Sequence, residues 1–120
     1  MTSTRASGPA EISQMPAELP PLPIAALMIG VYNLLCEGAD LPQPCHVSVS
    51  ETAQQIDLQF PGTQPSRRAI TGWAHRFGSV VSQHPHHDGR GQFTRVVATF
   101  GYYGLTVKAY AYIPHPAARI

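Results

Sequence analysis

Charged residues are few in this chain, and cysteine is scarcer still. Asp, Glu, Lys and Arg together make up 12% of its 120 residues, and the two cysteines are Cys36 and Cys45. They form no Cys-x-x-Cys pair and are too few for the dense disulfide framework of a small secreted domain. We therefore predict a fold that does not depend on disulfides and a reducing, cytoplasmic location.

Long apolar runs are also missing. The most apolar run covers residues 22 to 36 and is shorter than the ~20 residues that a membrane-spanning helix needs. It follows a proline-rich stretch and has no basic segment before it of the kind that opens a secretory signal. We therefore expect no membrane partner.

Recognisable catalytic motifs are absent too. No serine stands in a Gly-x-Ser-x-Gly elbow, and no glycine-rich phosphate loop follows a strand-like run. Catalytic residues also assemble from distant parts of a chain, so an enzyme stays open at this point. We nevertheless name no catalytic residue and no cofactor, and favour a non-enzymatic protein.

The few charges are unevenly distributed along the chain. Residues 1 to 60 hold one basic and six acidic side chains, whereas residues 61 to 120 hold seven basic side chains and one acidic side chain. Such a bias indicates a nucleic-acid surface only if the fold gathers the basic side chains on one side. We favour the simpler explanation, in which an acidic half packs beside a basic half. The candidate phosphate contacts are Arg67, Arg68 and Arg76.

The chain length suits one domain. Residues 1–21 are rich in Ser, Thr, Pro and Ala and show no apolar period, which predicts a disordered N-terminal arm. Residues 22–114 are expected to form a single α+β domain, and residues 115–120 a short tail.

An apolar stripe predicts a first helix from Leu22 to Glu37. Pro23 suits the first helical turn and Gly38 suits the position after the last one. The other side of this helix is hardly polar, so either the rest of the domain or a second chain covers it; it holds Ala25, Ala26, Ile29, Tyr32 and Cys36. The stripe itself consists of Ile24, Leu27, Met28, Val31, Leu34 and Leu35.

The rest of the domain alternates between strand and helix patterns. Residues 45–50 and 55–60 alternate apolar and polar side chains, as do residues 93–100 and 105–113, which predicts two hairpins. Between them, Pro65 opens a second helix whose apolar stripe runs from Ile70 to Val81. The order αββαββ predicts a four-stranded antiparallel sheet with both helices on one face.

The stretch QHPHHDG, residues 83–89, is the candidate metal site. Zinc takes three or four ligands, usually from two elements, whereas His84, His86 and His87 come from one stretch, and Pro85 disfavours a helical histidine pair. We expect a polar loop between the second helix and the third strand, with no native metal. A pH switch is a second functional interpretation of these imidazoles.

The uncovered face of the sheet is the strongest candidate for a binding surface. Tyrosines with Arg and Lys on such a face are typical of protein interfaces and of single-strand nucleic-acid binders. We hypothesise protein contact or self-association, including a homodimer, with nucleic-acid binding by the basic second half as the alternative. The candidate residues are Arg95, Thr99, Lys108, Tyr110 and Tyr112.

Three stretches also carry a family resemblance. They are Leu41-Pro42, the helix around Trp73, and the closing run VKAYAYIP from Val107 to Pro114. In these residues and in its layout the chain resembles small uncharacterised proteins of actinobacteria and their phages. The resemblance implies the αββαββ order and a bacterial or phage cytoplasm, and it implies no activity.

Overall fold

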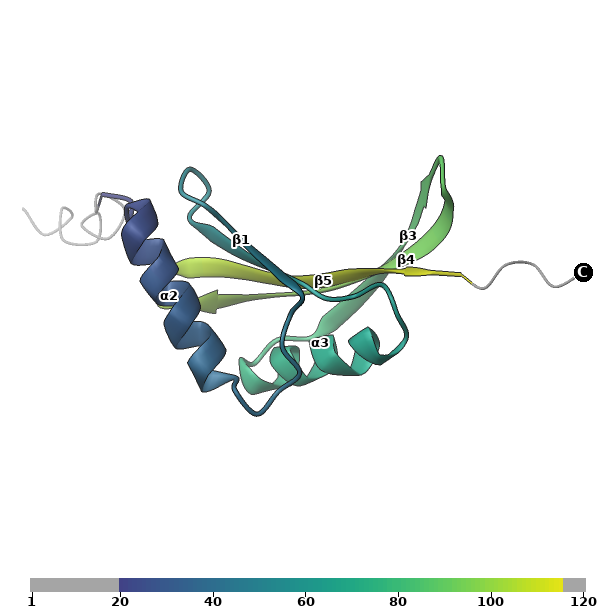
Figure 1. Cartoon of the computed structure of the whole chain (residues 1–120), viewed down its shortest axis with the longest axis horizontal. Coiled ribbons are helices and arrows are strands. Elements are labelled where there is room, and N and C mark those ends of the chain that lie inside the picture. The colour runs from purple at the N-terminus through teal and green to yellow at the C-terminus, as the bar shows by residue number, and fades with distance from the viewer. Residues whose placement is uncertain (1–19, 116–120) are drawn as a thin grey trace, which may run out of the picture.

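The structure is a computed structural model that describes residues 20–115, and this part of the chain forms two helices and one five-stranded sheet (Figure 1). The predicted α+β class is confirmed. The predicted arm, apart from Pro20 and Pro21, and the predicted tail, apart from His115, lie outside the described residues. The elements are α2 (Ile24–Glu37), β1 (His46–Ser50), β2 (Gln55–Gln59), α3 (Pro65–Arg76), β3 (Val81–Asp88), β4 (Gly91–Tyr102) and β5 (Leu105–Pro114).

The sheet has the strand order β1-β2-β5-β4-β3, so the last strand in sequence lies in the middle. β2 and β5 run parallel, with Ile56 opposite Val107, and the other three pairings are antiparallel. The prediction of a four-stranded antiparallel sheet is therefore wrong in strand number and in direction.

The additional strand is the histidine-rich stretch that we expected to be a loop. β3 pairs with β4 along its whole length, from Val81 opposite Ala98 to Asp88 opposite Gly91. It is an edge strand, where Pro85 is tolerated because a missing N–H on the solvent side breaks no ladder hydrogen bond. An edge position also needs little apolar surface, so polar side chains did not prevent the strand from forming.

The parallel pairing follows from the path of the chain. After β2 the chain crosses the sheet through α3 and begins β3 at the far edge, and β4 and β5 then return strand by strand. β5 consequently meets β2 from the side opposite β1, and the central strand pairs with neighbours on both sides.

Both helices pack on the same face of the sheet, as predicted. Phe77, just after α3, stacks on Phe100 of β4 with ring centroids 4.8 Å apart, and Gly30 of α2 lies over Leu105 of β5. Trp73 of α3 is fully buried, and its Nε1 donates a hydrogen bond to the Pro42 carbonyl at 2.8 Å. One core results, whose other main members are Leu27, Leu34, Ile56, Leu58, Phe60, Ile70, Val96, Ala98, Val107, Ala109, Ala111 and Ile113.

The second helix ends earlier than the apolar stripe suggested. α3 ends at Arg76, and Gly78 adopts a left-handed φ of 74° that reverses the chain. The N–H of Ser79 then donates to the Ala74 carbonyl at 2.7 Å, which satisfies one of the last carbonyls of the helix. The prediction included Val80 and Val81 in this helix. In the structure Val80 is exposed and Val81 begins β3, so neither belongs to α3. Among the described residues, no helix has the length and apolar character of a membrane span.

Candidate binding surface on the open sheet face

The side chains of the sheet alternate between the helix-covered face and an opposite face that no described helix covers, called here the open face. On β4, buried Val96 and Ala98 point to the helices, so Arg95 and Thr99 point to the open face. On β5, buried Val107, Ala109 and Ala111 alternate with the other candidates in the same way. All five predicted residues, Arg95, Thr99, Lys108, Tyr110 and Tyr112, therefore share the open face.

The strand register brings these residues together in pairs. Arg95 lies opposite Tyr112, and Thr99 lies opposite Lys108. Tyr110 and Tyr112 are neighbours along β5 on the same side, with ring centroids 5.9 Å apart and an edge-to-face orientation. All of these side chains except exposed Thr99 are half-buried. They are thus accessible to a partner and yet partly fixed by their neighbours.

Two aromatic rings that are not among the five predicted residues of the open face extend this surface toward β3. His86 lies 4.9 Å from Tyr112 and 6.3 Å from Phe93 between ring centroids. The guanidinium of Arg90 lies 5.6 Å from the centre of the Phe93 ring, in cation–π geometry. A strip of rings therefore runs across the open face through Tyr110, Tyr112, His86 and Phe93. Residues 82–88 are polar apart from Pro85, so no apolar–polar alternation marks a face in this stretch; the pairing of His84 with Arg95 and of His86 with Phe93 places both histidines on the open face.

The open face carries charges of both signs. Arg95 and Lys108 contribute positive charge, and none of the ion pairs within the described residues involves them. Asp57 of β2 lies opposite Lys108 in the register and accepts a hydrogen bond from Gln55 at 2.6 Å. Burial raises the pKa of Tyr110 above its ordinary value, and the negative charge of Asp57 adds to that shift. Tyr110 therefore stays a neutral hydrogen-bond donor at physiological pH.

The three arginines proposed as phosphate contacts lie on α3, on the other side of the sheet. Arg67 donates to the side chain of Gln83, and Arg76 holds the carboxylate of Asp40 with two hydrogen bonds of 2.6 and 3.1 Å. Arg68 is exposed and borders a pocket. The structure does not bring these arginines together with Arg95 and Lys108 on one surface.

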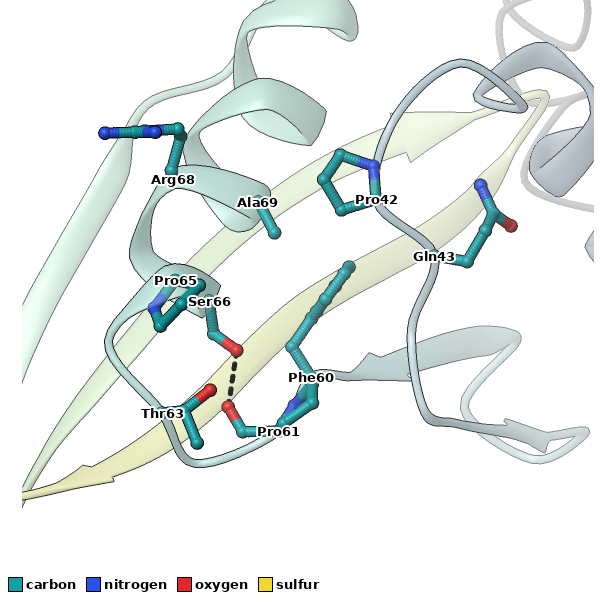
Figure 2. A pocket seen from close by; sticks show the side chains of 9 residues that line it. All are labelled: Pro42, Gln43, Phe60, Pro61, Thr63, Pro65, Ser66, Arg68 and Ala69. Atoms are coloured by element: carbon teal, nitrogen blue, oxygen red, sulfur yellow. Dashed lines mark hydrogen bonds between the residues drawn. The ribbon is translucent and has the colours of Figure 1, made fainter.

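That pocket, of about 310 Å³, opens between the loop before β1 and the start of α3 (Figure 2). Pro42 and Phe60 lie on one side of it, and Pro65 and Ala69 on the other, with Arg68 at the rim. The Ser66 hydroxyl is already used, because it donates to the Pro61 carbonyl at 2.5 Å. Within the described part of the chain, the lining offers mainly apolar surface, the polar side chains of Gln43 and Thr63 and one guanidinium, and it holds no acid–base pair for catalysis. No sequence motif predicts this pocket, because its walls come from separate segments of the chain.

The histidines of β3 do not converge. Since side chains alternate along a strand, His84 and His86 point to the open face and His87 points to the opposite side. His84 Nε2 lies 3.3 Å from the Ser82 hydroxyl, and His86 Nε2 lies 3.7 Å from a carboxylate oxygen of Asp88. Among residues 20–115, no three His, Cys, Asp or Glu side chains are arranged to hold a metal ion.

In comparisons with known proteins, the chain matched no protein-family model, no curated protein and no solved structure. The resemblance to small actinobacterial and phage proteins therefore stays an expectation, and the open face has to be interpreted from its own geometry.

Proposed function

We propose that the protein is a non-enzymatic binding or accessory module that contacts another protein through the open face. The observation that carries the proposal is the strip of half-buried rings beside Arg95 and Lys108 on the one sheet face that neither helix covers. A domain that packs both helices on one side leaves its polar and aromatic strand positions available on the other.

The chemistry of this face suits a protein partner. Tyrosine and arginine are enriched at protein interfaces, and the few residues that dominate binding energies are often of these types. A tyrosine ring buries a large area and has only two side-chain torsions to fix, so ordering it on binding costs little entropy. The contacts between Tyr110, Tyr112 and His86 already restrict those torsions in the free protein.

Single-stranded nucleic acid is the second candidate for the same face. Bases stack on exposed aromatic rings of a sheet, and nearby cations neutralise the phosphates. Tyr110 and Tyr112 with Arg95 and Lys108 supply both elements. Arg67, Arg68 and Arg76 lie beyond the helix-covered face, so this candidate is proposed without them.

The protein-binding proposal is tested by comparing which proteins different variants capture from an extract of the native host. The open-face variant is Arg95→Ala with Tyr112→Ala, and the matched control on α3 is Arg68→Ala with Thr71→Ala. All forms are first shown to melt at similar temperatures by circular dichroism. The proposal expects a partner that the wild type and the α3 control retain and the open-face variant loses. A set of captured proteins that is identical for all three forms contradicts it.

The nucleic-acid candidate is tested by fluorescence anisotropy with labelled single-stranded DNA and RNA. If it holds, affinity falls steeply as salt rises, and Tyr110→Ala weakens binding by roughly 10-fold, as expected for a lost stacking contact of ~1–3 kcal/mol. Absence of binding at low salt removes this candidate and leaves the protein-binding proposal standing.

A further inference from the structure

The side of α2 that points away from the core is apolar, and nothing else among residues 20–115 covers it. Leu27, Val31 and Leu34 fill the core, whereas Ile29 is 62% exposed and Tyr32 is 69% exposed. Ala25 and Cys36 are exposed on the same side. These four positions, Ala25, Ile29, Tyr32 and Cys36, are spaced four, three and four residues apart, and we call them the α2 seam.

This spacing is that of a coiled-coil seam. Residues that alternate three and four apart line one side of a helix and interlock with a second helix as knobs into holes. Met28, which is 54% exposed, flanks the seam and widens its apolar surface. The inner stripe already satisfies the packing of α2 in its own domain, so the seam is apolar surface that the described fold does not use.

The charges of α2 favour an antiparallel partner helix. No charged side chain occurs between Ile24 and Cys36, so two copies of the helix approach without like-charge repulsion. The first turn holds no acidic residue and the last turn no basic residue, and the N-cap makes no side-chain hydrogen bond. At the C-terminal end Arg76 donates a hydrogen bond of 2.9 Å to the Glu37 carbonyl, whereas the N-terminal end has no side-chain cap. An antiparallel partner helix would place the negative partial charge of its own C-terminal end beside this N-terminal end.

We propose that a second copy of this chain covers the seam, with the two α2 helices packed antiparallel across a two-fold axis. The seam reads the same in both directions: small residues at its ends, Ala25 and Cys36, enclose the large residues Ile29 and Tyr32. In the antiparallel pair, Ala25 lies opposite the partner's Cys36, and Ile29 lies opposite the partner's Tyr32. This match of small with small and large with large is what a two-fold axis requires of one surface.

The exposed area sets the expected strength of the dimer. The exposed parts of Met28, Ile29 and Tyr32, the large side chains on and beside the seam, amount to roughly 400 Å², if a large side chain is assigned ~200 Å². Stable interfaces bury about 800 Å² on each partner, and smaller ones are typical of transient complexes. We therefore expect a reversible dimer whose population depends on protein concentration. The dimer occupies α2 and leaves the open face free, so it stands or falls separately from the proposed function.

The first test is sedimentation velocity over a concentration series with the full chain. The wild type should pass from monomer to dimer as concentration rises, and Ile29→Asp should raise the dissociation constant at least 10-fold. Val80→Asp is the matched control, because it places the same charge at an apolar residue that is 81% exposed and outside the seam. A wild type that stays monomeric up to its solubility limit, as expected if residues 1–19 or a different protein cover the seam, overturns the proposal. So does an Ile29→Asp variant that dimerises like the wild type.

The second test reads the orientation of the helices by disulfide trapping. In a Cys45→Ser background, Ala25→Cys should form disulfide-linked dimers with the partner's Cys36 when copper–phenanthroline oxidises the two thiols. Residues 25 and 36 of one helix are separated by ~16 Å at ~1.5 Å per residue, so they form no bond within a chain. The same variant with Cys36→Ser should form no linked dimer.

The control without Ala25→Cys decides between helix directions. With Cys36 alone, the antiparallel dimer keeps the two thiols at opposite ends of the seam and yields no linked dimer. A rapid Cys36–Cys36 link indicates parallel helices and overturns the proposed arrangement. Equal linking of every variant indicates random collision and overturns it as well.

Discussion

Replacing Gly38 by alanine tests how tightly α2 is docked on α3. A methyl group at Gly38 would overlap Cη2 of Trp73 and would lie 2.7 Å from Cζ3 and 2.9 Å from Cζ2 of the same ring. The backbone at Gly38 has φ of −100°, which alanine adopts without strain. The cost of the substitution therefore comes from the contact with the indole and not from the backbone conformation.

The magnitude depends on whether the indole can move. Trp73 is fully buried, its Nε1 is fixed to the Pro42 carbonyl, and its ring centroid lies 5.9 Å from that of Phe77. Overpacking a core by one methyl group costs ~1–3 kcal/mol and occasionally more. Because the new methyl meets three atoms of one rigid ring, we expect Gly38→Ala to lower the free energy of unfolding by ~3 kcal/mol. That is a large share of the ~5–15 kcal/mol typical of a small domain.

The assay is urea denaturation followed by far-UV circular dichroism, since Trp73 is the only tryptophan and its fluorescence changes when it is replaced. Trp73→Leu removes the atoms that the methyl would meet, so the double variant should lose ~2–3 kcal/mol less than the two single losses combined. Gly72→Ala is the control, because its methyl meets one flexible Leu41 methyl at 3.3 Å and gains helix propensity of up to ~1 kcal/mol. Wild-type stability in Gly38→Ala, or additive losses in the double variant, would refute the reasoning.

Three further predictions follow from local features. Gly78→Ala should cost ~1 kcal/mol by urea denaturation, because its left-handed φ disfavours a side chain although no atom lies near; Gly78→Asn should cost less. Tyr102→Phe should cost ~1 kcal/mol in the same assay, because it removes the 2.6 Å hydrogen bond that the Tyr102 hydroxyl donates to Glu37, and an unchanged stability would show that water replaces the bond. Hydrogen bonds from Arg76 lower the pKa of Asp40, so the stability that this pair contributes is present above the unfolded-state pKa of ~3.9 and is lost as pH falls below it. Urea midpoints measured from pH ~5 down to pH ~2 should therefore fall less steeply in Asp40→Asn, and identical slopes would contradict the assignment.

The helices and the two faces of the sheet could be predicted from the sequence, because both depend on the spacing of apolar residues within a short segment. Leu27, Val31 and Leu34 repeat at helical spacing, and Pro23 and Gly38 bound the same helix. On β5, strict alternation separates core residues from open-face residues such as Tyr110 and Tyr112 without knowledge of the neighbouring strands. The candidate binding residues could therefore be placed on one face from sequence.

Features that depend on distant parts of the chain could not be placed in this way. The parallel pairing of β2 with β5 joins segments about 50 residues apart and leaves no local mark in either strand. β3 has no strand pattern in the sequence, because an edge strand needs neither an apolar face nor backbone hydrogen bonds on both sides, and it therefore tolerates Pro85. Val80 and Val81 continue the helical period by coincidence, while Gly78 supplies the turn that ends it. The pocket beside Arg68 and the ring strip through His86 depend on these same long-range contacts.

The central position of β5 has a consequence for how the protein matures during translation. Until residues 105–113 leave the ribosome, the β1–β2 and β3–β4 hairpins share no hydrogen-bonded border, because each pairs with β5 instead of with the other. The apolar sides of α2 and α3 then have no complete sheet to pack on. Nascent chains in which β5 has not yet emerged should therefore be the ones that chaperones retain. We therefore expect the domain to close late, and a chain truncated just before β5 should be one that proteases digest readily.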